Sequence, residues 1–152
     1  MTTTVTAAQI VDEARTWDGT PFLHQAALKG VGCDCVGLIR GIAVELGLAF
    51  DRAAWKAFAN YPRLPNPKRM ADGLAAFMVS IEPADLSHGD VVFLEWREEL
   101  PMHLGVYATD RGRATLVHAL AEAGKVCEHG FNHPWPDRLS SCWRYRERVG
   151  GA

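Results

Sequence analysis

Three residues far apart in the sequence have side chains suited to nucleophilic catalysis: Cys35, His103 and His118. A thiolate is a strong nucleophile, a nearby imidazole can act as its base, and a third group can hold that imidazole in one orientation. Such residues meet in a folded chain without being neighbours in sequence. Their types therefore predict acyl transfer through a thioester.

Cys35 begins a predicted helix over residues 35–46, where apolar residues recur on one stripe and Gly47 follows. The glycines of the preceding loop, Gly30 and Gly32, give it a permissive backbone. Unpaired amides and the helix dipole favour a thiolate at a helix N-terminus, so we expect a lowered pKa at Cys35. The same amides can receive an oxyanion, which contributes about 3 to 4 kcal/mol per donor.

The two histidines are predicted on neighbouring strands. His103 begins the strand 103–108 and His118 lies near the end of the strand 114–119. A hairpin through residues 109–113 would bring both to the same end of a sheet. That arrangement permits an imidazole pair, with His103 as general base and His118 as the group that orients it.

The rest of the chain predicts an α+β fold, because helical patterns come first and strand patterns follow. An antiparallel sheet would pack its inner face on the helix that carries Cys35. A length of 152 residues fits one domain over 1–152. The other predicted elements are helices over 4–17 (capped by Thr4), 53–59 and 69–79, a proline-rich excursion over 61–67, and strands over 90–94 and 142–146.

Composition excludes several classes of function. A net charge of -2 and a pI near 6.3 give no footprint for nucleic acid. The densest basic stretch, Arg138 to Arg148 with Arg144 and Arg146, alternates like a solvated strand face. No apolar run is long enough for a membrane span or a signal peptide, so we expect synthesis in the cytoplasm. Four cysteines indicate reduced thiols rather than a disulfide framework.

A zinc site is the main chemical alternative, but its usual spacings are poorly matched. His129 and His133 are spaced for a metal pair, whereas Cys33 and Cys35 are too close together. We therefore expect no metal. Asp90 is predicted to start a strand and to bond local backbone. The remaining cysteines are assigned to structural positions, and the remaining histidines to the surface or to loops. The residues concerned are Cys33, Cys127, Cys142, His24, His88, His129 and His133.

Five motifs in order resemble the NlpC-type cell-wall hydrolases, papain-like cysteine peptidases that cleave peptidoglycan stem peptides. The resemblance runs through nearly the whole chain and implies that family's fold, catalytic residues at Cys35, His103 and His118, and no cofactor. It also places Phe22, His24 and Asp34 in the substrate-binding or oxyanion neighbourhood. The motifs are Trp17-Asp-Gly-Thr-Pro-Phe22, Asp34-Cys-Val-Gly-Leu38, Gly89-Asp-Val-Val-Phe93, His103-Leu-Gly-Val-Tyr107 and Val117-His-Ala119.

The dipeptide His24-Gln25 and the segment Gly30-Val31-Gly32 are most similar to short variants encoded with phage tails and gene transfer agents. That subgroup implies assembly into a phage-like particle with tail or baseplate proteins as partners, and needs no export signal. The family resemblance implies cleavage of the γ-D-glutamyl to diaminopimelate bond.

The chain departs from the family at Phe22, where a tyrosine is usual and its hydroxyl commonly points at the nucleophile. Loss of one oxyanion donor costs about a hundredfold in rate, unless a group such as His24 substitutes. Two alternatives therefore stay open. One is a structural tail-tip or hub component with weak or no peptidase activity, and the other is a related acyltransferase or amidase.

Overall fold

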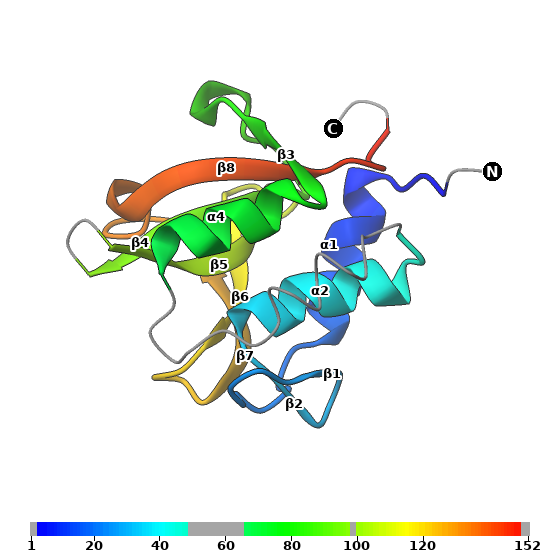
Figure 1. The fold of residues 1–152 in the computed structure, drawn as a ribbon, viewed down its shortest axis with the longest axis vertical. Coiled ribbons are helices and arrows are strands. Elements are labelled where there is room, and N and C mark those ends of the chain that lie inside the picture. Colours follow the sequence, from blue (N-terminus) through cyan, green and yellow to red (C-terminus); the bar gives the residue numbers. More distant parts are fainter. Residues whose placement is uncertain (1–2, 49–65, 98–99, 150–152) are drawn as a thin grey trace.

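The computed structural model describes residues 3–48, 66–97 and 100–149. In these residues, six antiparallel strands form one sheet in the order β3-β8-β4-β5-β6-β7, and α1, α2 and α4 pack on it (Figure 1). None of the described helices has the length and apolarity to cross a membrane. The elements are α1 Ala7–Thr16, β1 Ala27–Leu28, β2 Gly32–Cys33, α2 Cys35–Glu45, α4 Pro67–Ala75, β3 Met78–Ile81, β4 Val91–Arg97, β5 Leu100–Ala108, β6 Thr115–Leu120, β7 Lys125–Gly130 and β8 Leu139–Tyr145.

The predicted α+β class with an antiparallel sheet is confirmed, and the four predicted strands correspond to β4, β5, β6 and β8 within a few residues. The strands β3 and β7 were not predicted. The predicted helix over 69–79 is wrong at its end, because α4 stops at Ala75 and Val79 lies in β3. The helix predicted over 53–59 and most of the excursion over 61–67 lie outside the described residues, while Pro67 begins α4.

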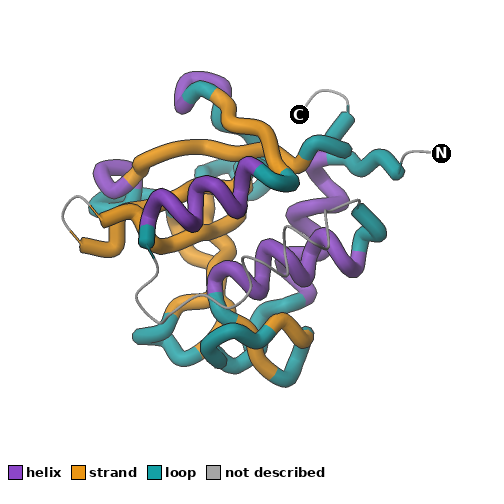
Figure 2. The backbone as a smooth tube through the Cα atoms, viewed as in Figure 1, coloured by secondary structure: helices purple, strands orange, loops and turns teal. Residues whose placement is uncertain are grey.

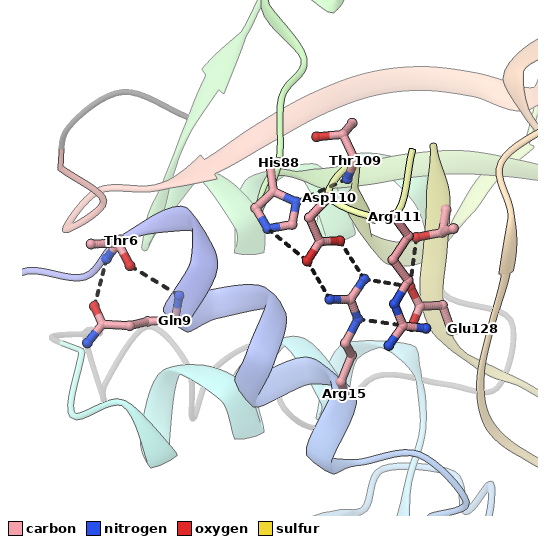
Figure 3. Close-up of polar contacts among 9 residues, drawn as sticks. Thr6, Gln9, Arg15, His88, Thr109, Asp110, Arg111 and Glu128 are labelled. Atoms are coloured by element: carbon pink, nitrogen blue, oxygen red, sulfur yellow. Dashed lines mark hydrogen bonds and ion pairs between the residues drawn. The ribbon is translucent and has the colours of Figure 1, made fainter. Parts of the chain in front are cut away.

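The first helix begins later than its apolar pattern suggested. Thr6, not Thr4, is its N-cap: the Thr6 hydroxyl accepts from the Gln9 amide, and the Gln9 side chain accepts from the Thr6 amide (Figure 3). This reciprocal capping satisfies two amides that a helix start leaves unpaired. The buried face of α1 then carries Ile10, Val11 and Ala14 into the core.

The sheet separates two apolar clusters. Alternate residues of β5, including Leu104 and Val106, join the large cluster formed with the helices, while Tyr107 packs with the smaller cluster that contains Leu116 and Trp135. This alternation follows from the two-residue period of a strand. Figure 2 shows the purple helices lying in front of and beside the orange strands. In the neighbouring strand β6, Val117 and Ala119 likewise join the large cluster and Leu116 the smaller one.

An arginine ties α1 to the hairpin end of the sheet. The guanidinium of Arg15 donates to Asp110, at 2.7 and 2.8 Å, and to Glu128 of β7, at 3.0 and 2.9 Å (Figure 3). The hydrogen bonds from Arg15 lower the pKa of the Asp110 carboxyl to about 2. Charge-assisted pairs of this fork geometry fix orientation as well as adding energy. They hold the helix that precedes the Cys35 loop against β7.

A second ion cluster lies at the start of β4. Asp90 is fully buried and accepts from the Ser87 amide, as expected of a strand-start residue bonding local backbone. It also accepts from Arg144 at 2.8 Å and Arg148 at 2.6 Å, which the sequence did not indicate. The prediction of a wholly solvated arginine face near the C-terminus is therefore wrong at these two positions, because a buried carboxylate requires paired cations.

Contact between α1 and α2 depends on Gly41. A Cβ atom at this position would lie 2.2 Å from Cη2 of Trp17, whose side chain is buried. We expect Gly41→Ala to lower the free energy of unfolding by about 2 kcal/mol, since overpacking outweighs the gain in helix propensity. Urea denaturation measures the change. The control is Val44→Ala on the exposed side of the same helix, expected to change stability by less than about 0.5 kcal/mol. Equal effects of the two substitutions would contradict the packing constraint.

Candidate functional site

The thiol of Cys35 lies at the first residue of α2, against β5. Its Sγ atom is 4.0 Å from the carbonyl oxygen of Met102, and the backbone of Leu104 also hydrogen bonds to it. These two residues flank His103 in the strand. The structure therefore brings the start of the predicted nucleophile helix to the part of β5 that carries the predicted base.

Asp34 fixes the position of that helix start. Its carboxylate is buried, with Oδ1 accepting from the Gly37 amide at 2.8 Å and Oδ2 from the Gln25 amide at 2.7 Å. Gln25 has a φ of 64°, an uncommon conformation for a residue with a side chain. One carboxylate thus caps α2 and holds the preceding loop over its first turn.

A glycine permits this close approach. A Cβ atom at Gly37 would lie 1.8 Å from the carbonyl oxygen of Ala26, which itself accepts from the Asp34 amide. The Gly in the motif Asp34-Cys-Val-Gly-Leu38 therefore has a steric reason. It lets the loop that carries His24 pack directly on the nucleophile helix.

The expectation of a lowered thiol pKa at Cys35 is wrong. Burial, followed by the charge of Asp34, raises the pKa of the Cys35 thiol to about 12. Hydrogen bonds from the backbone of Leu104, Val36 and Cys35 act in the predicted direction but are weaker. The thiol therefore keeps its proton at neutral pH, because desolvation penalises the thiolate more than the helix amides stabilise it.

The predicted imidazole pair is present, and a third histidine extends it. His103 Nε2 lies 2.7 Å from His118 Nδ1, and His118 Nε2 lies 2.7 Å from His129 Nε2. His129 Nδ1 is 2.9 Å from the carbonyl oxygen of Gly130. The assignment of His129 to the surface or a loop is therefore wrong: it is a half-buried residue of β7, which pairs with β6.

Burial keeps the inner two imidazoles neutral. Desolvation lowers the pKa of His103 to about 4, with the nearby charge of Arg138 and then His129 acting in the same direction. Desolvation, then His103 and His129, lower the pKa of His118 to about 2. Both rings therefore remain uncharged over the physiological range of pH, and each has one nitrogen with hydrogen and one without.

The other residues expected near the substrate lie beside this centre. The Phe22 ring packs against the large apolar cluster, and its backbone forms a bridge with Cys33, two residues before the thiol. His24 Nδ1 is 3.8 Å from Asp34 Oδ2. Phe22 and His24 thus lie next to Cys33 and Asp34, the two residues that precede Cys35.

The remaining cysteines and histidines are distributed through the fold. The described chain contains no group of three or more His, Cys, Asp or Glu side chains arranged to hold a metal ion, and its four cysteines are unbridged. Cys33 and Cys142 are buried, whereas Cys127 is half-buried. His133 is exposed, and His88 lies in a loop, as expected, although its side chain is buried and accepts from the Thr109 amide.

The chain belongs to the NlpC/P60 family, whose model matches residues 19–144. This span includes Cys35, His103, His118 and His129. No curated protein matches the chain significantly.

Solved structures share the fold at low sequence identity. An NlpC/P60 family protein from Bacillus cereus has a TM-score of 0.65 and 19% identity, over 93% of this chain and 41% of that one. The peptidoglycan hydrolase RipB from Mycobacterium tuberculosis has a TM-score of 0.60 and 19% identity, over 94% of this chain and 65% of RipB. An N-acetylmuramoyl-L-alanine amidase from Bacteroides uniformis has a TM-score of 0.65 and 11% identity, over 92% of this chain and 98% of the amidase. The chain spans about two fifths of the Bacillus cereus protein and of a similar NLP/P60 family protein from Staphylococcus aureus.

The raised thiol pKa has a measurable consequence. Iodoacetamide reacts with the thiolate, so its rate with Cys35 should rise about tenfold per pH unit between pH 6 and 9, and stay below that of a free cysteine. Alkylation followed by peptide mass spectrometry measures the rate at each cysteine, and Cys35→Ala identifies the peptide. A rate plateau between pH 5 and 8, as a thiolate–imidazolium pair gives, would contradict the neutral resting state.

Proposed function

We propose that this chain is a cysteine peptidase that hydrolyses peptidoglycan stem peptides, with Cys35 as nucleophile, His103 as general base and His118 as the residue that orients the base. The observation that carries the proposal is the position of the Cys35 thiol, at a capped helix start against the backbone on both sides of His103. Membership of the NlpC/P60 family and the contact between the two imidazoles support it.

The geometry suggests a sequence of steps. The Cys35 sulfur attacks the peptide carbonyl as His103 takes the thiol proton, and the carbonyl oxygen gains charge beside the amides of the first turn of α2. The C–N bond then breaks, and the leaving amine takes the proton from His103. Water, deprotonated by His103, releases the acyl group and restores the thiol. The resting neutral pair places the proton transfer within the first step, after substrate has bound.

The scissile bond and biological setting are finer parts of the same proposal. We propose cleavage between D-glutamate and diaminopimelate, by a protein that is made in the cytoplasm and assembled into a phage-like or gene transfer agent tail with baseplate proteins. The support is the resemblance of His24-Gln25 and Gly30-Val31-Gly32 to the tail-associated variants. The loop that contains them is held on the nucleophile helix by Asp34.

One observation favours a second candidate function. Phe22 has no hydroxyl where the family usually has a tyrosine, which weakens the case for fast turnover. The alternative is a structural tail-tip or hub component that uses the same fold for protein contacts, with weak or no peptidase activity.

Product analysis with matched variants tests the main proposal. Purified peptidoglycan fragments are incubated with wild-type protein, Cys35→Ala and Cys142→Ala under reducing conditions with a chelator, and the products are identified by mass spectrometry. Cys142 is the control because it is buried in β8, where it pairs with β4. We expect wild type and Cys142→Ala to release the same peptides, and Cys35→Ala to release none. Cleavage by Cys35→Ala would refute the nucleophile. No cleavage by any of the proteins would favour the structural alternative, and cleavage between muramic acid and L-alanine would assign an amidase.

Restoring the absent hydroxyl tests the role of position 22. We expect Phe22→Tyr to raise kcat on a stem peptide by about ten- to a hundredfold, because a hydrogen-bond donor near the oxyanion stabilises the transition state more than the substrate. Steady-state kinetics measures the change, with Phe77→Tyr as a control for a hydroxyl added to the same apolar cluster. An unchanged or lower kcat in Phe22→Tyr would contradict an oxyanion role at this position.

A further inference from the structure

The carbonyl of Gly130 determines the hydrogen position on His129. A carbonyl oxygen only accepts, so His129 Nδ1, at 2.9 Å, must carry the hydrogen that joins them. In the neutral ring, His129 Nε2 then has a lone pair. It can only accept from the nitrogen that faces it at 2.7 Å, which is Nε2 of His118.

The same reasoning continues along the chain of rings. If His118 carries its hydrogen on Nε2, its Nδ1 has a lone pair and accepts from His103 Nε2 at 2.7 Å. His103 then has no hydrogen on Nδ1, the nitrogen able to take a proton from a thiol. A donor in the place of His129 Nε2 would reverse both bonds and put a hydrogen on His103 Nδ1.

The surroundings of the three rings hold this arrangement together. Trp135 packs on all of them, with ring centroids 6.4 Å from His103, 5.1 Å from His118 and 5.1 Å from His129. The Cζ atom of the Arg138 guanidinium also lies over the Trp135 ring, 5.0 Å from its centroid. His118 is fully buried and His103 nearly so, which leaves few alternative hydrogen-bond partners in water. The tautomers are therefore coupled to one another rather than set ring by ring.

We propose that His129 is a positioning residue for the reaction: anchored on the Gly130 carbonyl, it accepts from His118 and thereby fixes the tautomers of His118 and His103 that leave His103 Nδ1 able to accept the Cys35 proton. The inference rests on the proposed function for its catalytic meaning. The hydrogen-bond order itself does not depend on any substrate. Enforcing the wrong tautomer on a catalytic histidine costs about ten-thousandfold in rate, so a variant that only mixes the tautomers should lose less than this.

The order of the bonds is tested without substrate. Long-range ¹H–¹⁵N correlation spectra of the histidine rings, recorded at pH 7.5, report which nitrogen of each ring carries hydrogen. In wild type we expect His103 and His118 with hydrogen on Nε2, and His129 with hydrogen on Nδ1. The variants are His129→Leu, which removes the acceptor, His129→Glu, which retains one, and His133→Ala as a control at an exposed histidine.

We expect the His103 and His118 signals to keep the Nε2–H form in His129→Glu and His133→Ala, and to shift toward a tautomer mixture in His129→Leu. On a stem-peptide substrate, kcat should fall about ten- to a hundredfold in His129→Leu with KM within about twofold, and recover to within about fivefold of wild type in His129→Glu. Thermal unfolding is measured for each variant. Wild-type tautomers in a folded His129→Leu, or Nδ1–H on His118 in wild type, would overturn the proposal. If no protein cuts the substrate, the proposed function fails while the ring spectra still decide the hydrogen-bond order.

Discussion

The structure depends on docking the first turn of α2 against β5. The buried carboxylate of Asp34 makes this possible, because each of its oxygens accepts a hydrogen bond from a backbone amide. One amide belongs to Gly37 in the helix and the other to Gln25 in the preceding loop. Burying a carboxylate costs several kcal/mol unless hydrogen bonds such as these compensate for the lost solvation. The cap, the loop conformation and the position of Cys35 are therefore parts of one interaction.

The same docking sets the electrostatics of the site. Excluding water from the junction of α2 and β5 raises the pKa of the Cys35 thiol and lowers that of the His103 imidazole, so the resting pair is neutral. In the proposed reaction, charge then develops only when a substrate carbonyl is present to receive it. In such an arrangement the orientation of neutral hydrogen-bond donors and acceptors matters more than stored ionic charge. This is the physical basis of the role proposed for His129.

The sequence predicted the parts of the fold whose signals are local. The apolar stripe after Cys35 predicted α2, and the alternation after His103 predicted β5. The predicted hairpin through residues 109–113 placed His118 beside His103. In contrast, the segment Lys125–Gly130 has a burial pattern in which Val126 alone is buried, so β7 carries little strand signal and His129 was missed. A glycine turn at Gly124 after β6 was the available sign of a hairpin. The thiol pKa was misjudged because the helix start is visible in sequence, whereas its desolvation depends on tertiary packing.

Trapping the covalent intermediate tests the central claim, that Cys35 forms a thioester with a stem-peptide acyl group. Wild-type protein is mixed with a defined stem peptide, quenched in acid within milliseconds to seconds, digested and mapped by mass spectrometry. The account predicts a transient adduct on Cys35 with the mass of the acyl half of the substrate, appearing before the free acid accumulates. Product release without any such adduct, or an adduct on Cys33 or Cys127, would contradict it.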